Sequence, residues 1–420
     1  MKLVQKHIIM PNNEYYKDLR EMMHRSKNLY NAALFNVRQY YFKVKDDTTV
    51  KYKYLNYYAN WRTLSSTQNP DFKALPNHIA SQVVRQVDNN FSSFFALLKK
   101  KSKGIYTSSV NIPKYLKTGG VNQIVIDTWA KKKLQEGYLQ IPTTKILIKV
   151  GLEVSKLNIK QIRLIPCNGY ITLEFIYEVP DIQSKTDNKR YMSIDLGINN
   201  LCSCSSNVIN SFIVNGKPVK SINQYYNKQV ARYKSICEKV NHKKSSKRIQ
   251  RLNFKRKNKI EDYFHKTSSY IVNQLVSNEI NTLVIGHSSY WKQDIKLGKV
   301  NNQNFVQIPF NKLIQMLSYK CKLVGINCVI QEESYTSKAS FIDNDEIPVY
   351  KEGEKAEYNF SGKRIKRGLY CSVSGIRINA DVNGSLNILR KYLKVNSDDL
   401  FDINSRDFRG FVYNPKVINL

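Results

Sequence analysis

The sequence predicts a multidomain α+β protein with a small β-rich domain, an inserted helical region and a second, α/β domain. Three observations support this. Long stretches with apolar residues at helical spacing fill the first hundred positions, and short strand-like stretches follow up to about residue 180. The second half begins with three strands and then alternates strands with helices. At 420 residues the chain is long enough for two or three domains, each with its own core.

The chain is strongly basic. It contains 67 Lys and Arg residues against 33 Asp and Glu, a formal charge of +34. Such an excess predicts phosphate contacts and salt-sensitive binding to a polyanion. Membrane headgroups are the other anion to consider, but no apolar run approaches the length of a spanning helix. The start, MKLVQKHIIM, is too short and too soon polar for a secretory signal. We therefore expect a cytoplasmic protein with nucleic-acid partners and no membrane.

The seven cysteines include no C-x-x-C pair. Cys202 and Cys204 face the same way on a predicted strand and make a poor chelate. We expect reduced, buried or surface thiols.

The first domain begins with a strand over residues 1–10. Helices are predicted from about 14 to 42 and from 76 to 101, each with a stripe of apolar residues. Short strands then occupy 121–127, 137–142, 145–150, 160–165 and 170–179, the last two joined by the hairpin signal Asn168-Gly169. We expect a helical lobe inserted into a small β-barrel-like domain.

Aromatic residues alternate with Lys and Arg between Tyr40 and Trp61. Rings beside cations can stack on bases while the cations hold phosphate. A core role explains most of these rings more simply, and both interpretations stay open.

A polar linker is predicted over residues 183–189, and a long helical region from Ser221 to about Val276. Within this region, about half of the residues from Lys239 to Lys259 are Lys or Arg and none is acidic. A solvated helix face is the alternative, but this density favours contact with nucleic acid. The candidate residues here are Lys243, Lys244, Lys247, Arg248, Arg251, Lys255, Arg256 and Lys257.

Three carboxylates follow predicted strands or begin a helix. Asp195 ends the strand that begins at Tyr191, and Asp381 starts a helix. Glu333 and its neighbour Glu332 follow the strand 326–330. Three strands followed by alternating strands and helices is an RNase H-like order, in which acids at the carboxyl ends of neighbouring strands converge. By itself, Asp381 is also explained as a helix N-cap.

Three carboxylates in a basic chain suggest a metal-dependent nuclease. Phosphodiester hydrolysis requires an activated water and a stabilised leaving oxygen, and two Mg²⁺ ions about 4 Å apart supply both. Mg²⁺ prefers oxygen ligands and keeps several waters, so two or three carboxylates suffice. We expect Asp195 to bridge the ions, with Glu333 and Asp381 on either side. Asn383 is expected to orient Asp381 or to touch phosphate.

The sequence resembles the TnpB nucleases of insertion sequences, relatives of the Fanzor proteins and of type V CRISPR effectors. The resemblance is nearly full length. It is carried by the motifs HRSKNLYNAALFN, LPNHIASQVVRQVDNNFSSFF, IDLGINNL, DYFHKTSSYIV, YTSKAS and INADVNGSLNILR. It implies a Mg²⁺-dependent nuclease that carries a guide RNA made from the transposon end. Such a nuclease reads a short flanking motif on double-stranded DNA, and base pairing reads the target.

The resemblance also implies a prokaryotic protein that acts on the nucleoid, with a monomer on one RNA as the default. It further implies a domain organisation. A wedge-like oligonucleotide-binding barrel would comprise 1–15 and 110–182, and a helical recognition lobe 16–109. After the linker, a RuvC-like nuclease domain would comprise 190–338 and 377–396. A small target-binding module would occupy 339–376, and a C-terminal tail 397–420.

Two departures from the family pattern matter. Gly286 stands where many relatives have the second acid, and a branch of the family carries that glutamate on the following strand, ahead of a Thr-Ser pair. Glu333, three residues before Thr336, fits that branch. Glu332 should face the other way if the pleat persists, so we expect Glu333 to be the ligand.

The second departure concerns zinc. The family's module normally carries two C-x-x-C pairs. Here Ala339 and Ile342 replace the first pair, and the second keeps Cys371 but has Ser374 in place of its other cysteine. We therefore expect no zinc. The basic end of this module is expected to contact the guide–target duplex through Lys363, Arg364, Lys366 and Arg367.

Two other functions remain open. Relatives that lose an acid persist as nuclease-dead, RNA-guided DNA-binding repressors. A transposase that joins DNA ends with an RNase H-like core would share the acids, but it does not predict the barrel and the helical lobe.

Overall fold

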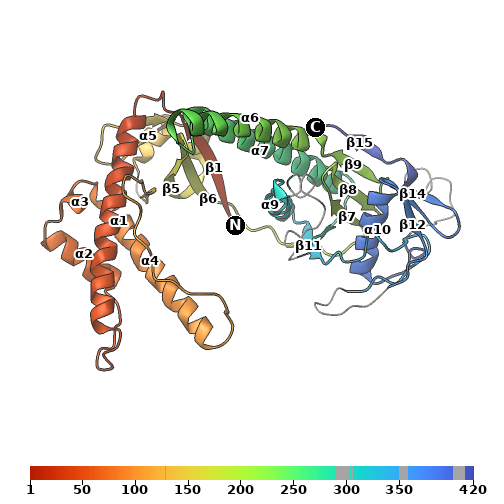
Figure 1. Ribbon diagram of the computed structural model, residues 1–420, viewed down its shortest axis with the longest axis horizontal. Helices are drawn as coiled ribbons and strands as arrows, with labels where there is room; N and C mark the ends of the chain where they lie inside the picture. Colours follow the sequence, from red (N-terminus) through yellow and green to blue (C-terminus); the bar gives the residue numbers. More distant parts are fainter. Residues whose placement is uncertain (128, 289–302, 304–305, 350–357, 401–411) are drawn as a thin grey trace. The chain divides into compact units, whose positions relative to one another are not determined.

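The computed structural model describes residues 1–127, 129–288, 303, 306–349, 358–400 and 412–420. The chain divides into two compact units, Met1–Pro180 and Asp181–Leu420, whose elements are labelled in Figure 1. Within the described residues, no helix combines the length and the apolar character needed to cross a bilayer.

The first unit contains the predicted helical lobe. Its two long helices follow the apolar stripes closely, and they bury residues such as Leu19, Met23 and Val87 completely. Two short helices connect them and pack on both. The helices of the lobe are α1 (Tyr16–Val44), α2 (Tyr57–Ser66), α3 (Pro70–Lys73) and α4 (Asn77–Ser102).

The strands of the first unit form a four-stranded antiparallel sheet in the order β1-β6-β5-β2, and β3 and β4 form a separate hairpin. The strands are β1 (Lys2–Ile9), β2 (Ile124–Ile126), β3 (Tyr138–Gln140), β4 (Leu147–Lys149), β5 (Asn158–Cys167) and β6 (Tyr170–Glu178). Helix α5 (Lys131–Gln135) and the 3₁₀ helix η1 (Leu152–Lys156) lie between strands. The predicted two-residue turn joins β5 to β6, with Gly169 at a φ of 93°.

This arrangement differs from a single continuous barrel. In the described residues, the pairing leaves β1 and β2 at the two edges of the sheet. Strand β2 has three residues, because only Ile124 and Ile126 are buried in its segment. Such a short edge strand leaves few backbone groups to pair with another strand.

The second unit is built on a six-stranded sheet in the order β11-β10-β7-β8-β9-β15. The strands β7, β8 and β9 are antiparallel neighbours, whereas β10 pairs in parallel with both β7 and β11. This is the predicted order of three strands followed by parallel crossovers. The bounds are β7 (Tyr191–Leu196), β8 (Asn200–Ser206), β9 (Phe212–Asn215), β10 (Thr282–Gly286), β11 (Asn327–Gln331) and β15 (Lys416–Ile418).

Alternating residues of the central strands face opposite sides of this sheet. Met192 and Ile194 join a core that also contains residues of two helices, α7 (Lys247–Ser277) and α9 (Phe310–Lys322). On the other face, Tyr191 and Val284 pack against Ile388 and Leu389 of α10 (Ala380–Leu393). Figure 1 shows α10 beside β7 and β8, the strands with which it makes most of its contacts. The face that carries α10 also carries the candidate acids.

The long basic region forms two helices rather than one. Helix α6 (Lys217–Asn241) ends where His242 takes a left-handed conformation, and α7 begins after Ser246, whose hydroxyl accepts the Ile249 N–H. The two helices run side by side (Figure 1). The seven-residue linker expected at 183–189 is not free, because the Lys185 N–H donates to the Gly325 carbonyl at 2.8 Å and Asn281 donates to the Thr186 carbonyl.

A three-stranded antiparallel sheet of β12 (Lys363–Lys366), β13 (Leu369–Cys371) and β14 (Arg377–Asn379) begins in the range predicted for the small module, 339–376, and extends three residues beyond it. Strand β14 leads directly into α10. The segment expected as a C-terminal tail contributes β15, which pairs in parallel with β9 and completes the large sheet. Its description as a tail is therefore corrected.

Candidate active site

Three elements of the second unit bring the three candidate acids to one end of the sheet. Asp195 lies near the end of β7, Glu333 follows β11, and Asp381 lies in the first turn of α10. Strands β7 and β11 flank β10 in parallel, so their carboxyl ends share one edge of the sheet. Asp195 and Asp381 are 186 positions apart in sequence (381 − 195 = 186). The sheet and α10 bring the three acids together.

Helix α10 is fixed against β7 by small residues. The Ser193 hydroxyl, on the same face of β7 as Asp195, donates to the Ser385 carbonyl at 2.6 Å. A Cβ atom on Gly384 would lie 2.7 Å from Asp195 Oδ2. Only glycine therefore lets the helix backbone approach the carboxylate this closely. The first turn of a helix also favours a nearby negative charge.

The carboxylates interact electrostatically. Burial first, and then the negative charges of Glu333 and Asp381, raise the pKa of Asp195 well above its ordinary value, and the Arg364 guanidinium acts in the opposite direction. Burial, followed by the charge of Glu332, raises the pKa of Glu333 to about 7. Like charges that share a poorly solvated site hold protons until a cation compensates them.

The neighbours Glu332 and Glu333 have different surroundings. Glu332 accepts a 2.6 Å hydrogen bond from Lys391, whose side chain is only 7% exposed, and a second one from the Ser334 N–H. Burial acts to raise the pKa of Glu332, but these hydrogen bonds outweigh it and the pKa is lowered. Glu333 lies against Gly286 instead, where an added Cβ would be 2.9 Å from its Oε2. Glu332 is thus committed to Lys391, and Glu333 is the acid that affects Asp195.

Asp381 does not cap its helix. Asn379 does so, accepting the N–H groups of Asp381 and Val382 at 3.0 and 3.3 Å. The Asp381 carboxylate is left for other contacts, and it accepts the Asn200 amide at 2.6 Å on Oδ2 and lies 3.3 Å from Arg364 on Oδ1. The explanation of Asp381 as a simple N-cap is therefore wrong.

Carboxylates are suitable ligands for Mg²⁺, and the uncompensated charge around Asp195 is of the sign that a cation would neutralise. As the side chains stand, however, no group of three or more His, Cys, Asp or Glu residues in the described ranges is arranged to hold an ion. The donor set fits a metal by its chemistry, while Asp381 is turned toward Arg364 and Asn200.

Asn383 has a different place from the one expected. Its side chain is fully buried, accepts the Phe341 N–H at 3.0 Å and donates to the Ala339 carbonyl at 2.8 Å. Both of these hydrogen bonds hold the turn before the small module, so Asn383 orients backbone rather than Asp381. The residue that contacts Asp381 is Asn200, which sequence reasoning missed although it lies in the same motif as Asp195.

The basic candidates on α6 and α7 divide into two groups. Most are exposed in the connection at 242–246 or along α7, namely Lys243, Lys244, Lys247, Arg248, Arg251, Lys255 and Lys257. Arg256 is different, because its Nε donates to Asn223 at 2.7 Å and its guanidinium lies 4.9 Å from the Tyr226 ring centroid. Arg256 also donates to the Gln307 carbonyl. Its expected role in binding nucleic acid is corrected to a contact between helices.

The small module is packed around an apolar cluster that includes Phe341, Ile342 and Tyr370. Ala339 and Ile342, at the positions of the replaced C-x-x-C pair, are both buried. Among its basic residues, Lys363, Arg364, Lys366 and Arg367 are all exposed. Arg364 is the one that reaches a candidate acid.

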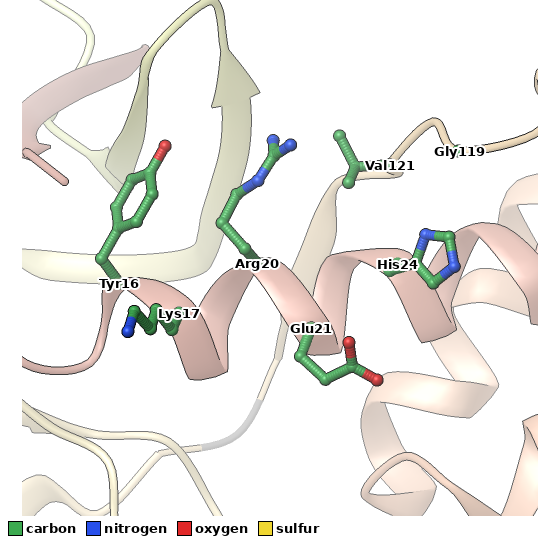
Figure 2. Close-up of a pocket in the computed structure, with 7 residues that line it drawn as sticks. All are labelled: Tyr16, Lys17, Arg20, Glu21, His24, Gly119 and Val121. Atoms are coloured by element: carbon green, nitrogen blue, oxygen red, sulfur yellow. The ribbon is translucent and has the colours of Figure 1, made fainter.

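A cavity of about 310 Å³ lies in the first unit, between the start of α1 and the segment Gly119–Val121. Figure 2 shows Tyr16, Lys17, Arg20, Glu21 and His24 of α1 around it. His24 is fixed by a 3.0 Å hydrogen bond to the Gly120 carbonyl. The lining mixes both signs of charge and contains none of the three acids, so we assign it no catalytic role.

Two family models match parts of this chain. Residues 174–292 match the OrfB_IS605 family model, described as "Probable transposase", and residues 310–388 match "Cas12f1-like, TNB domain". The first match contains Asp195, and the second contains Glu333 and Asp381.

Two relatives cover most of the chain. The "TnpB-like protein ORF457" of Acidianus two-tailed virus is 22% identical over 92% of this chain and 86% of that protein. The solved "Cryo-EM structure of the Cas12f1-sgRNA-target DNA complex" covers 90% of this chain and 82% of its own, with a TM-score of 0.50 and 15% identity. At that identity the likeness concerns the fold alone. The chain is therefore similar to two family models and, over most of its length, to a TnpB-like protein, and it shares its fold with the Cas12f1 complex.

Proposed function

We propose that this protein is an RNA-guided DNA endonuclease encoded by a transposable element, cleaving double-stranded DNA beside a short flanking motif. The observation that carries the proposal is the placement of Asp195 and Glu333 at the ends of β7 and β11, which both pair in parallel with β10, together with Asp381 in the first turn of α10. The TnpB-like relative and the fold shared with a complex of guide RNA and target DNA support guide RNA and DNA as partners. The exposed cations of α7 supply the matching charge.

Asp195, Glu333 and Asp381 are the residues that would hold Mg²⁺, with Asp195 between the other two. Two bound Mg²⁺ ions would activate the attacking water and stabilise the leaving oxygen. The chain's own residues contribute the arrangement: Gly384 and Ser385 hold the α10 backbone against β7, and Asn200 orients the Asp381 carboxylate. Lys391 holds Glu332 away from the metal-binding set.

The relocated glutamate is the part of this proposal that a mutation tests best. In guided cleavage with Mg²⁺, we expect Glu333→Gln and Asp381→Asn to lose at least about a hundredfold in rate, since even an outer-shell partner of a metal contributes about 10–100-fold. Glu332→Gln is the matched control, because an amide at this position still accepts from Lys391. Full activity of Glu333→Gln would refute the assignment of the glutamate.

A nuclease-dead, RNA-guided DNA-binding repressor is the second candidate. The ion pair that engages Asp381 is the observation in its favour. Guided DNA binding without cleavage in Mg²⁺ or Mn²⁺ would decide for the repressor. Purification without any bound RNA, from cells that carry the flanking element, would exclude both guided functions and leave the transposase interpretation.

A further inference from the structure

Arg364 links the exposed basic strand of the small module to the candidate acids. It lies in β12, and its guanidinium Nη2 is 3.3 Å from Asp381 Oδ1. The same positive charge also acts on Asp195. One arginine therefore compensates part of the negative charge of two of the three carboxylates.

This contact engages Asp381, which is one of the three expected metal ligands. Asp381 Oδ1 faces Arg364, and Oδ2 accepts the Asn200 amide at 2.6 Å. Because Asn379 caps α10, Asp381 has no capping role that would hold it there. Both carboxylate oxygens of Asp381 are thus engaged by side chains of the protein, although a carboxylate is a suitable ligand for Mg²⁺.

The ion pair is also easy to exchange. The side chains of Arg364 and Asp381 are 45% and 33% exposed, and pairs this exposed contribute little to stability. Strand β12 is exposed along its whole length, and within the described residues no ion pair engages its other cations, Lys363 and Lys366. A phosphodiester accepts two parallel hydrogen bonds from a guanidinium and so competes well for Arg364.

We propose that Arg364 is a DNA-responsive counter-ion: it pairs with Asp381 when no DNA is present and exchanges to a backbone phosphate when a DNA strand lies along β12. The exchange frees Asp381 to bind metal. This inference rests on the proposed nuclease function. It makes DNA binding and metal binding mutually reinforcing, since coupling between two ligands is reciprocal.

The test measures Mn²⁺ binding rather than cleavage. The full chain with its guide RNA is titrated with Mn²⁺ by electron paramagnetic resonance, with and without a phosphorothioate DNA target that cannot be cut. Without DNA, we expect Arg364→Ala to bind Mn²⁺ about two- to fivefold more tightly than the parent, in keeping with a weak, exposed pair. DNA should tighten Mn²⁺ binding by the parent and leave Arg364→Ala nearly unchanged.

The matched control is Arg377→Ala, which removes the same charge from an exposed position on strand β14 of the same sheet. Its Mn²⁺ affinity should stay at the parent's value, and an equal gain there would overturn the inference in favour of a general charge effect. An unchanged affinity in Arg364→Ala, or the same DNA effect in that variant as in the parent, would also overturn it. Asp195→Asn separates the two levels: if the parent has no Mn²⁺ site that this change removes, the proposed function itself fails.

Discussion

At the scale of single residues, Gly286 explains how the site accommodates its glutamate. A Cβ at this position would lie 2.3 Å from Ile388 Cδ1 and 2.9 Å from Glu333 Oε2. The position faces α10, and Ile388 is completely buried. The space that a side chain would take on β10 is therefore filled by Glu333 and Ile388. The glycine at 286 and the position of the Glu333 side chain therefore belong to one packing arrangement.

Gly286→Ala should therefore overpack this contact. We expect a loss of about 1–3 kcal/mol in the free energy of unfolding, as for other insertions into packed sites. Adding Ile388→Val removes Cδ1, so the double variant should regain stability measured by denaturant titration. Metal affinity should stay weakened in the double variant, because the new Cβ still displaces Glu333. Recovery of both properties together would contradict a direct contact with Glu333.

The raised pKa of Glu333 predicts how stability depends on pH in the absence of metal. Its pKa is about 7 in the folded chain against an ordinary value of 4.5, so the folded state binds a proton that the unfolded chain has released. Stability should therefore fall as pH rises from about 4.5 to 7. Thermal unfolding in chelator should show this slope in the parent and a flatter one in Glu333→Gln.

Glu332→Gln separates the two causes of this slope. Its charge is the second cause of the raised pKa of Glu333, and burial is the first. Removing the charge should therefore flatten the slope only in part, whereas Glu333→Gln should remove the contribution of Glu333 altogether. A slope in Glu333→Gln as steep as that of the parent would show that the slope does not arise from Glu333.

At the scale of elements, α6 and α7 combine a structural contact with an exposed charged face. Arg256 of α7 contacts α6 through Asn223 and Tyr226, and it also donates to the Gln307 carbonyl ahead of α9. Arg251 and Lys255, one turn apart on α7, are exposed. A basic helix therefore contains cations that make structural contacts as well as cations that are exposed. The surroundings of each side chain distinguish the two groups, whereas the sequence pattern did not.

Replacing Arg251 and Lys255 by Gln should reduce the salt dependence of nucleic-acid binding. Each lost phosphate contact lowers the slope of log K against log salt by about 0.7–0.9. Binding titrations from low to moderate salt measure this slope. Arg256→Gln should instead lower thermal stability and leave the slope unchanged, and a slope change as large as that of the exposed residues would contradict its role between the helices.

The small module has an apolar core of its own. Phe341, Ile342 and Tyr370 form a core with Ile378 and Val382. The Tyr370 hydroxyl donates to the Lys338 carbonyl at 2.7 Å. Burial of these apolar side chains supplies free energy of folding that a structural zinc contributes in other small modules.

At the scale of the whole molecule, the boundary between the two units falls at Pro180, and the polar segment that follows belongs to the second unit. Lys185 and Thr186 hydrogen-bond to that unit, and the Tyr191 hydroxyl donates to Asp187 at 2.7 Å. The segment 183–189 thus has the composition of a linker, but it is attached to the second unit by hydrogen bonds.

Hydrogen exchange of the full chain tests this attachment. Peptides covering 183–191 should exchange more slowly than expected for an unstructured linker, because the Lys185 amide is bonded to Gly325. Asn281→Ala removes the hydrogen bond to Thr186 and should accelerate exchange of this segment locally. Exchange at the unstructured rate in the parent would show that the segment is free.

The sequence by itself determined many of the elements of this protein. The buried strand before Asp195, the helical stripes in α1 and α4 and the turn at Gly169 are local patterns, and local sterics and burial suffice to specify them. The charge of +34 and three carboxylates at element ends pointed to nucleic acid and metal. The pleat predicted that Glu332 and Glu333 face different ways, and in the structure the two carboxylates have different surroundings, although both follow the end of β11 at Gln331.

Only the tertiary structure decided which of these groups meet. The pairing of Arg364 with Asp381, the burial of Asn383 on the backbone and the position of Arg256 between two helices depend on contacts between residues distant in sequence. β15 joins the sheet for the same reason, since an edge strand of three residues is specified by its partner β9 rather than by its own pattern. Side-chain contacts across the fold carry no periodicity that a sequence displays.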